Sequence, residues 1–308
     1  MGVLYVLEDI RNPVLDFLFS LFTFLGSEAA VLVLAMVLLW CGDKKFGRLV
    51  LYTGFFSLGS NILLKNIFRV PRPWVRDPSF TAVESALPGA TGYSFPSGHT
   101  ANAVTSYGCV AVFGRGRAVR IICGSAVFLI ALSRLYLGVH TFWDVLVSMV
   151  LGVVILFAVE YVYRRSLESR KFRNLLDGAC VVFAVVMLAY VLLTQGNGDS
   201  ELDAEGVKNA YSAFGAVLAF VFAMRFDDAY IKYPTEAALW AQALKLVLGA
   251  VLVFGVKEIL KEPLNMVFAY HPFAHAVRYF FMVAVGGVIW PMSFGVWSRL
   301  GRARKKNQ

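Results

Sequence analysis

Charged residues are scarce in this chain. Only 16% of its 308 residues are Asp, Glu, Lys or Arg, whereas soluble domains carry about 25%. The chain therefore cannot cover a water-facing surface in the usual way, which argues against an ordinary soluble domain.

Cysteine and histidine patterns that would indicate a metal or redox site are also missing from the sequence. The four cysteines lie in or beside apolar stretches, and no pair has the spacing of a zinc site or a redox motif. We expect them to be small buried hydrophobic residues. His271 and His275 are four residues apart, but two ligands are too few for zinc and Pro272 lies between them. No metal is predicted.

Nucleic-acid binding and a cleaved leader are not indicated either. The net charge is +9, but the basic residues cluster at the ends of apolar runs rather than in a broad patch interleaved with aromatics. No nucleic-acid partner is predicted. The first residues carry Glu8 and Asp9 where a signal peptide would carry basic residues, so we expect no cleaved signal peptide.

Long apolar runs are abundant. Hydrophobic residues make up 58% of the chain, and the mean hydropathy is +0.66. Runs of about 17–25 apolar residues recur, the length that crosses a bilayer as a helix. The sequence thus predicts an all-α, polytopic membrane helical bundle with ten spans, although residues 1–26 could instead lie on the membrane surface. The predicted spans are 12–26, 28–42, 48–68, 99–114, 119–138, 142–163, 174–194, 210–226, 238–259 and 275–298.

The basic connections predict the orientation. They are residues 43–48, 115–120 and 164–173 and the tail 299–306. With ten spans all four fall on one side, which the positive-inside bias identifies as the cytoplasm. We expect a multi-pass protein of the plasma (inner) membrane with a cytoplasmic C-terminus, and an acidic loop at 199–205 on the outer side.

The chain is expected to have two parts. Residues 1–165 would form a six-span core, and residues 166–308 a C-terminal block of about four further transmembrane helices. The core contains a long Pro- and Gly-rich loop, residues 70–96, and long structured loops usually serve a function. No motif was found in residues 174–298, for which a structural role is expected, and a homo-oligomer is possible.

Three cations stand near the predicted outer side of the core. They are Lys65, Arg72 and Arg134. Phosphoryl transfer spreads negative charge over three equatorial oxygens, so positioned cations supply most of the catalysis. Arg binds phosphate in a bidentate manner and Lys acts as a point charge. Snorkelling at the interface is the alternative, but it explains Lys65 and Arg134 poorly because positive charge is otherwise scarce on that side.

The segment Pro96-Ser97-Gly98-His99 predicts a helix start. Pro96 disfavours helix at Phe95, and Ser97 is a good N-cap for the apolar run that follows. A helix start presents free N–H groups and a partial positive charge, which bind phosphate readily. Gly98 allows close approach of a ligand to the backbone. Taken alone, the segment could equally be an ordinary capped helix.

His140 and Asp144 are spaced i, i+4, which places both side chains on one helix face. A carboxylate bonded to one ring nitrogen fixes the tautomer and leaves the other nitrogen free to attack. Taken alone, this spacing is common and could be a polar pair near the membrane interface.

Together the patterns are more specific, and they resemble the signature of the type 2 phosphatidic acid phosphatase family. This membrane family shares its site with vanadium haloperoxidases and bacterial nonspecific acid phosphatases. The resemblance covers about residues 12–163 and matches every signature position in order. The matching stretches are Lys65-x6-Arg72-Pro73, Pro96-Ser97-Gly98-His99 and Ser133-Arg134-x5-His140-x3-Asp144.

The resemblance implies a role for each residue. His140 would be the nucleophile that takes the phosphoryl group, and Asp144 would orient its ring. His99 would be the general acid that protonates the leaving oxygen and later activates water. No metal or cofactor is implied. The residues that would hold the phosphate oxygens are Lys65, Arg72, Ser97, Gly98 and Arg134.

The expected function is a metal-independent lipid phosphate phosphatase that acts through a phosphohistidine at the outer face of the membrane. Polyprenyl diphosphate is the first expected substrate, and phosphatidic acid, phosphatidylglycerophosphate and lipid A are allowed. A lipid phosphotransferase with the same site is the first alternative. A non-enzymatic lipid transporter is the second, although inverted repeats are missing from the sequence and both histidines are present. A vanadium haloperoxidase is disfavoured because those relatives are water-soluble.

Overall fold

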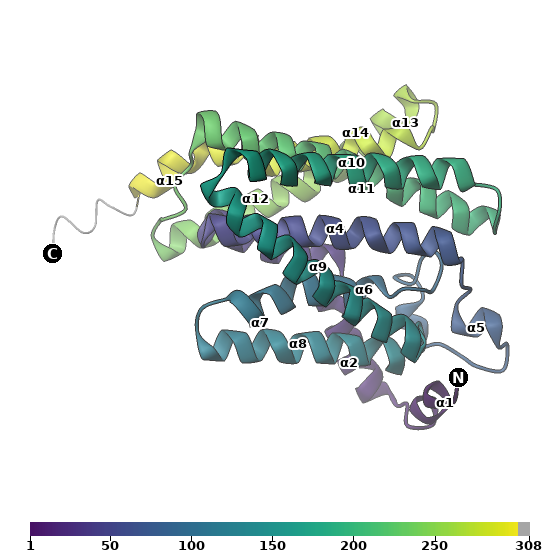
Figure 1. Cartoon of the computed structure of the whole chain (residues 1–308). Coiled ribbons are helices and arrows are strands. Elements are labelled where there is room, and N and C mark those ends of the chain that lie inside the picture. Colours follow the sequence, from purple (N-terminus) through teal and green to yellow (C-terminus); the bar gives the residue numbers. More distant parts are fainter. Residues whose placement is uncertain (301–308) are drawn as a thin grey trace.

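The protein is a bundle of helices (Figure 1). A computed structural model describes residues 1–300, and every regular element in this range is helical. The predicted all-α membrane class is therefore confirmed.

The elements of the first half end before the long helix α9. They are α1 (Gly2–Asp9), α2 (Pro13–Leu25), α3 (Glu28–Met36), the π-helix η1 (Val37–Cys41), α4 (Lys44–Phe68), α5 (Pro73–Arg76), the 3-10 helix η2 (Glu84–Ala86), α6 (Gly98–Ala103), the π-helix η3 (Val104–Gly108), α7 (Cys109–Phe113) and α8 (Arg117–Tyr136).

The second half consists of longer helices. They are α9 (Phe142–Glu168), α10 (Arg170–Thr194), α11 (Ser200–Phe226), the π-helix η4 (Asp227–Ile231), α12 (Leu239–Ile259), α13 (Lys261–Val267), α14 (Phe273–Ala284), the π-helix η5 (Val285–Ile289), the 3-10 helix η6 (Pro291–Ser293) and α15 (Phe294–Leu300).

Six helices among the described residues are long and apolar enough to cross a bilayer. They correspond to the last six predicted spans. Their bounds are Arg117–Tyr136, Phe142–Glu168, Arg170–Thr194, Ser200–Ile231, Leu239–Val267 and Phe273–Leu300.

The N-terminal region differs from the two separate spans predicted at 12–26 and 28–42. There α2 and the α3–η1 helix form one pair that is bent by 50°. The 13 residues of α2 extend only about 20 Å, which is too short for a hydrocarbon core of about 30 Å. Ser27 causes the break, because its side chain accepts a hydrogen bond from the N–H of Ala30 (3.3 Å) and starts a new helix.

Two predicted spans, 48–68 and 99–114, are helices inside the bundle. Figure 1 shows α4 in the middle, and it packs against α9, α10 and α11. Its buried face includes Thr53, Ser57, Asn61 and Asn66, which lower its hydropathy. The second helix runs through α6, η3 and α7. Both are therefore interior helices, and both carry residues of the candidate site.

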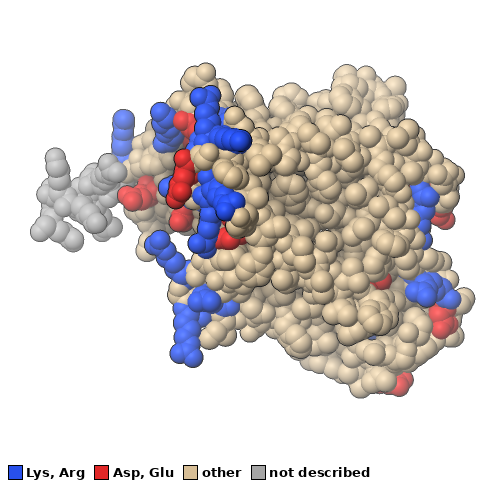
Figure 2. Space-filling view, viewed as in Figure 1, with Lys and Arg blue, Asp and Glu red and all other residues tan. Residues whose placement is uncertain are grey.

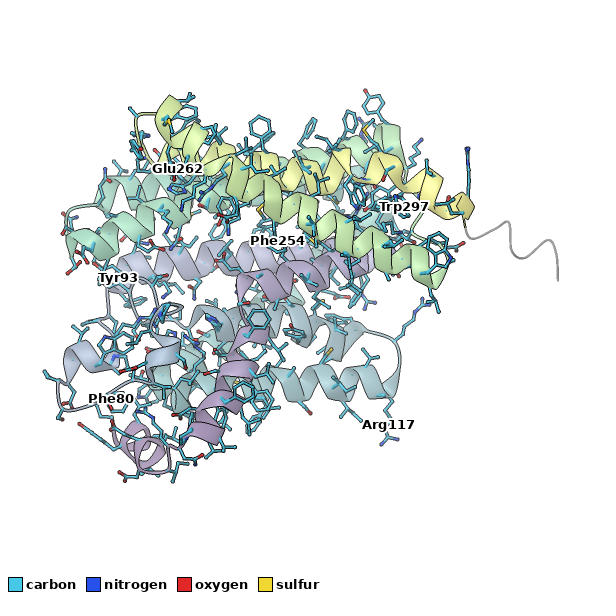
Figure 3. The ribbon with its side chains drawn as sticks, turned by 180° about the vertical axis from the view of Figure 1, so that it is seen from behind. Phe80, Tyr93, Arg117, Phe254, Glu262 and Trp297 are labelled. Atoms are coloured by element: carbon cyan, nitrogen blue, oxygen red, sulfur yellow. The ribbon has the colours of Figure 1, made fainter. Side chains whose placement is uncertain are left out.

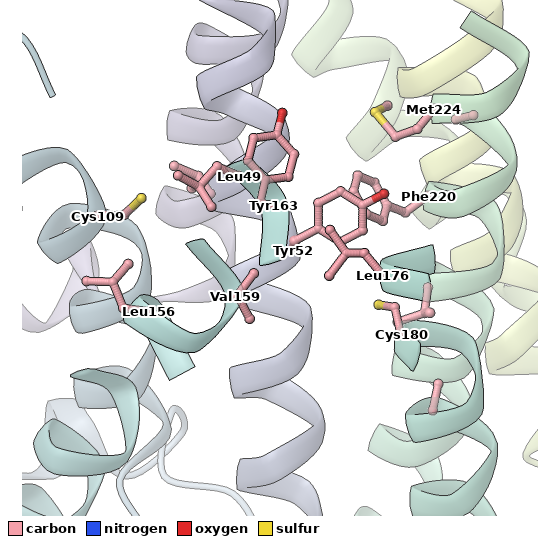
Figure 4. Close-up of a cluster of buried hydrophobic side chains, with 14 of the residues drawn as sticks. Leu49, Tyr52, Cys109, Leu156, Val159, Tyr163, Leu176, Cys180, Phe220 and Met224 are labelled. Atoms are coloured by element: carbon pink, nitrogen blue, oxygen red, sulfur yellow. The ribbon is translucent and has the colours of Figure 1, made fainter. Parts of the chain in front are cut away.

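The two parts of the chain share one hydrophobic core (Figure 4). A buried cluster joins Leu49 and Tyr52 of α4 and Leu156 of α9 to Leu176 of α10 and Phe220 of α11. The C-terminal helices are thus packed directly on the central helix of the first part.

Charged side chains gather at one end of the bundle, and the middle of the visible face is almost uncharged (Figure 2). At this end Asp227 accepts hydrogen bonds from Lys44 (2.7 Å) and Arg48 (2.6 Å). Arg117 and Trp297 lie here, whereas Phe80 and Tyr93 lie at the opposite end (Figure 3). Most of the predicted basic tail, 301–306, lies outside the described residues. An uncharged middle between polar ends is the pattern expected of a membrane protein.

A close helix contact provides a test of this packing. A Cβ atom on Gly215 of α11 would lie 2.0 Å from the carbonyl oxygen of Ala276 in α14. We expect Gly215→Ala to force the two backbones apart and to destabilise the protein by about 1–3 kcal/mol, seen as a lower Tm in detergent. Gly178→Ala is the matched control, because a Cβ there meets nothing within 4 Å. Equal Tm values for the two variants would contradict the contact.

Candidate active site

The three sequence patterns meet at the end of the bundle opposite the charged end. Lys65 lies in the last turn of α4 and Arg134 in the last turn of α8. Ser97 and Asp144 are buried, and they are joined by a hydrogen bond from the backbone N–H of Ser97 to the carbonyl oxygen of Asp144 (3.1 Å). The other predicted site residues line one cavity of about 290 Å³: Lys65, Arg72, Gly98, His99, Arg134 and His140.

Asp144 holds one side of the His140 ring. Its Oδ2 lies 3.5 Å from Nδ1 of His140. The same oxygen accepts hydrogen bonds from Oγ of Ser94 (2.6 Å) and from the N–H of Thr141 (2.8 Å). The side chain of Thr141 in turn accepts from the N–H of Asp144, which completes a capping box at the start of α9. The helix start therefore fixes the carboxylate beside the imidazole.

Arg72 lies on the other side of the ring. Its Nη1 is 3.1 Å from Nε2 of His140 and also donates to the carbonyl oxygen of Val139 (3.0 Å). Its Nε donates to the carbonyl of Gly92 (3.0 Å) and its Nη2 to that of Thr91 (2.7 Å). Arg72 thus links the long loop to the His140 segment. With Nδ1 facing the carboxylate, Nε2 is the nitrogen on the side of the cation.

Arg134 is the cation with unused hydrogen-bonding capacity. Its side chain is 1% exposed. Nη1 donates to Oγ1 of Thr23 in α2, but Nε and Nη2 are buried without a partner among the described residues. An unsatisfied buried donor is costly, more so on a charged group. An anion in the cavity would satisfy these two donors.

Lys65 and Asn61, one turn apart on α4, hold the loop that precedes α6. Nζ of Lys65 donates to the carbonyl oxygen of Tyr93, and Nδ2 of Asn61 donates to that of Pro96 (3.2 Å). The loop residues at the Pro96-Ser97-Gly98-His99 segment are therefore fixed to the central helix α4.

Ser97 stands immediately before α6, as the sequence predicts, but its side chain makes no capping hydrogen bond. Its Oγ accepts instead from Oγ1 of Thr100 (3.0 Å). The first N–H groups of α6 are consequently not capped by this hydroxyl, although α6 begins where expected.

Positive charges outnumber negative charges around His140. Burial, together with the cations Arg72, Arg134 and Lys65, lowers the pKa of His140 well below its usual range. The ring is therefore neutral near pH 7, and a neutral imidazole has a lone pair for attack. The same surplus of positive charge favours a bound anion.

Sequence reasoning missed a contact between the site loop and the C-terminal helices. The hydroxyl of Tyr93 donates to Oδ1 of Asp203 in α11 (3.0 Å). Oδ2 of Asp203 accepts from the N–H groups of Gly196 (2.9 Å) and Gly198 (3.1 Å). Both Tyr93 and Asp203 are buried. In the sequence, the acidic segment 199–205 indicates an outer loop but not its partner Tyr93.

No group of three or more His, Cys, Asp or Glu side chains within residues 1–300 could hold a metal ion. His271 and His275 have other neighbours. Nδ1 of His271 accepts from the N–H of Phe273 (3.2 Å), and Nδ1 of His275 lies 2.8 Å from Nη2 of Arg278.

Fold and site together define a polytopic membrane protein with a cationic cavity beside two histidines. The chain belongs to the PAP2 superfamily. The profile of that superfamily matches residues 45–168, and the transmembrane extension of the PAP2 superfamily phosphatases matches residues 211–303. The resemblance seen in the sequence is thereby confirmed.

Relatives that match this chain are named as phosphatases. Phosphatidylglycerophosphatase B of Bacillus subtilis is 31% identical over 49% of this chain and 76% of its own length. Undecaprenyl-diphosphatase BcrC of Bacillus subtilis is 34% identical over 48% of this chain and 74% of its own. A probable sphingosine-1-phosphate phosphatase of Dictyostelium discoideum is 26% identical over 54% of this chain, which spans only 43% of that relative. The predicted enzyme class, a phosphoric ester hydrolase, is confirmed.

A solved structure is also similar. The crystal structure of Aquifex aeolicus LpxE aligns with 52% of this chain and 93% of its own, with 25% sequence identity and a TM-score of 0.43.

The lowered pKa of His140 gives a pH prediction. Because the folded-state pKa lies below the ordinary value of about 6.5, the neutral ring is present above the lowered pKa and is lost only when the pH falls through it. In histidine-labelled protein, the imidazole resonance that disappears in His140→Ala should keep its neutral position down to pH values below about 6.5. A titration midpoint at or above that value would contradict the burial and cation contacts described here.

Proposed function

We propose that this protein is a metal-independent phosphatase of lipid phosphates or diphosphates that acts through a phosphohistidine at the membrane–water interface. The observation that carries the proposal is the pair of buried, unpartnered guanidinium nitrogens of Arg134 in a cavity that also contains His99 and His140. The activities of the relatives support the same chemistry.

The first half of the proposed reaction transfers the phosphoryl group to His140. Lys65, Arg72 and Arg134, with the side-chain hydroxyl of Ser97 and the backbone N–H of Gly98, bind the phosphate oxygens. Nε2 of His140 attacks phosphorus while Nδ1–H donates toward Asp144. The bond from phosphorus to the lipid oxygen breaks, and His99 gives that oxygen a proton. Arg72 must move its hydrogen bond from Nε2 to a phosphate oxygen before attack.

The second half releases phosphate. His99, now without its proton, takes one from a water molecule as that water attacks the phosphorus of phosphohistidine. The nitrogen–phosphorus bond breaks, inorganic phosphate leaves, and His140 returns to its neutral form. The three cations neutralise the charge that develops in both steps, so the mechanism needs no metal ion.

Polyprenyl diphosphate is the substrate that we propose first. The 34% identity to the undecaprenyl-diphosphatase BcrC supports it. Phosphatidylglycerophosphate and phosphatidic acid carry the same phosphate chemistry, and the name of the relative phosphatidylglycerophosphatase B supports the first of them as an alternative. The cavity chemistry at the phosphate end suits all of them.

We also propose that the active site faces outward from the plasma membrane and that the C-terminus is cytoplasmic. In this arrangement residues 1–165 form the catalytic core and residues 166–308 the extension. The support is the gathering of Lys and Arg at the end of the bundle away from the cavity (Figure 2), because positive residues favour the cytoplasmic side.

The proposed mechanism is tested by phosphate release from purified protein with excess chelator. His140→Ala should abolish release, and His99→Ala should lower kcat by about 10²–10⁴-fold, as for loss of a general acid. His271→Ala is the matched control and should keep full activity, because His271 lies outside the cavity lining. Activity that survives in His140→Ala, or that disappears with chelator, would refute the mechanism. Phosphate found on an acceptor lipid instead would identify a phosphotransferase.

The proposed orientation is tested by thiol labelling of intact cells. In a variant without its four native cysteines, a membrane-impermeant maleimide should label Glu84→Cys, an exposed position on the cavity side. It should leave Arg117→Cys, exposed at the opposite end, unlabelled until the cells are opened. The reverse result would place the active site in the cytoplasm.

A further inference from the structure

Residues 91–94 contact three of the side chains that the proposed mechanism uses. The first two carbonyl oxygens of this segment accept hydrogen bonds from Nη2 (2.7 Å) and Nε (3.0 Å) of Arg72. The third carbonyl oxygen accepts from Nζ of Lys65. The last residue donates its hydroxyl to Oδ2 of Asp144 (2.6 Å). The position of these four residues therefore affects two of the cations and the carboxylate that orients His140.

This segment has no regular secondary structure of its own. Gly92 has a φ of +66°, in the left-handed region that favours glycine. The N–H of Ser94 donates to the carbonyl oxygen of Val70 (2.8 Å), at the start of the long loop. A segment with few backbone hydrogen bonds opens more readily than a helix does. Its side-chain contacts thus help to determine where its carbonyl oxygens lie.

The side chain of Tyr93 anchors this segment to the C-terminal extension. Tyr93 is 5% exposed, and it lies at the cavity end of the bundle (Figure 3). Its hydroxyl donates to Oδ1 of Asp203 (3.0 Å) and accepts from the backbone N–H of Asp199 (3.2 Å). Both partners belong to the start of α11, so the extension determines where the hydroxyl of Tyr93 lies.

Asp203 is itself held in place at the start of α11. It lies in the first turn of this helix, where the helix dipole favours a carboxylate. Its Oδ2 accepts from the N–H groups of Gly196 and Gly198. Its Oδ1 also lies 3.5 Å from Nε of Arg69, the residue that ends α4. Asp203 thus joins the extension to the end of α4 as well as to the site loop.

Gly198 shows how closely the two parts of the chain meet here. A Cβ atom on Gly198 would lie 2.3 Å from the hydroxyl oxygen of Tyr93 and 2.9 Å from Cδ of Arg69. The connection between α10 and α11 therefore packs directly against both side chains.

We propose that Tyr93 and Asp203 are positioning residues for phosphoryl transfer, through which the C-terminal extension holds Lys65 and Arg72 where they bind the phosphate. The inference rests on the proposed function and deepens it, because it gives the extension a part in the chemistry of the core. Neither positioning residue gives or takes a proton in the reaction. Both act through residues 91–94, whose carbonyl oxygens fix the direction of the two cations.

The size of the expected effect follows from the chemistry of phosphoryl transfer. Cations stabilise the charge on the transferring group when they are correctly positioned, and a displacement of about 1 Å costs about 100-fold in rate. Without the hydroxyl of Tyr93, Asp203 keeps its hydrogen bonds to the two glycine N–H groups. The start of α11 should therefore stay in place while the site loop loses its anchor.

The test measures hydrolysis of farnesyl diphosphate and dioleoyl phosphatidate by the purified full chain in detergent, below the Tm of every variant. Tyr93→Phe removes the hydroxyl. Asp203→Asn leaves one acceptor oxygen, which cannot serve both the tyrosine and the glycine N–H groups. Each variant should lower kcat/KM by about 10-fold to 100-fold and should weaken inhibition by inorganic phosphate, which binds the same cations. The double variant should be no worse than the more severe single variant, because both changes remove one contact.

Tyr52→Phe is the matched control. Tyr52 of α4 is 4% exposed and donates its hydroxyl to Oδ1 of Asp177 in α10, so it also joins the core to the extension by a buried Tyr–Asp contact. It lies outside the cavity lining and about 20 Å along α4 from Lys65. Tyr52→Phe and Tyr93→Phe each lose one buried hydrogen bond, and both should lower Tm. Tyr52→Phe should leave kcat/KM and the inhibition by phosphate unchanged.

The outcomes separate the positioning role from the proposed function. Unchanged kcat/KM and phosphate inhibition in folded Tyr93→Phe or Asp203→Asn would refute the positioning role, and either variant suffices if the other does not fold. An equal loss of activity in Tyr52→Phe would refute it as well.

If the wild type hydrolyses neither lipid, the proposed function fails. The positioning role is then judged by the binding of inorganic phosphate, measured as a rise in Tm. A rise that is retained in Tyr52→Phe and reduced in Tyr93→Phe supports the positioning role. An equal rise in both variants refutes it, and the absence of any rise in the wild type refutes both proposals.

Discussion

The site depends on positive charge that the protein itself does not neutralise. Lys65, Arg72 and Arg134 line the cavity, and the carboxylate of Asp144 lies behind the ring of His140. Burying a charge is costly unless it is paired and hydrogen-bonded. Arg72 and Lys65 obtain this compensation from backbone carbonyls, but Arg134 is only partly satisfied. The protein therefore folds with two donors of Arg134 unsatisfied, and a bound anion would satisfy them.

The neighbouring structure explains how such an arrangement stays in place. Each segment of the site is tied to another one: loop 91–96 to α4, the α2 helix to Arg134, and the start of α9 to Ser97. The Tyr93–Asp203 contact extends these ties to the C-terminal helices. Repulsion between the three cations is therefore resisted by helices that are fixed in a common core, and the site is preorganised rather than formed by the ligand.

The sequence predicted the residues of the site well. It predicted the helices that hold these residues less well. The motifs named Lys65, His99 and His140, because phosphate chemistry needs those residue types, and the structure places them on one cavity. Hydropathy could not distinguish one bent pair of helices from two separate spans. A hydropathy value averaged over many residues does not detect a single helix-capping residue such as Ser27. Thr23 and Asp203 gave no local signal either, because their contacts join residues more than one hundred positions apart.

The C-terminal extension supplies part of the cavity wall through Ser212, Ala213 and Met282. A phosphatase of membrane lipids must hold a phosphate at the water interface while the rest of the substrate stays among apolar groups. Small residues on α11 shape this wall, because Gly215 allows α14 to approach and Ala213 and Ala216 line the cavity. The extension thus helps to shape the cavity in which the proposed chemistry of the core takes place.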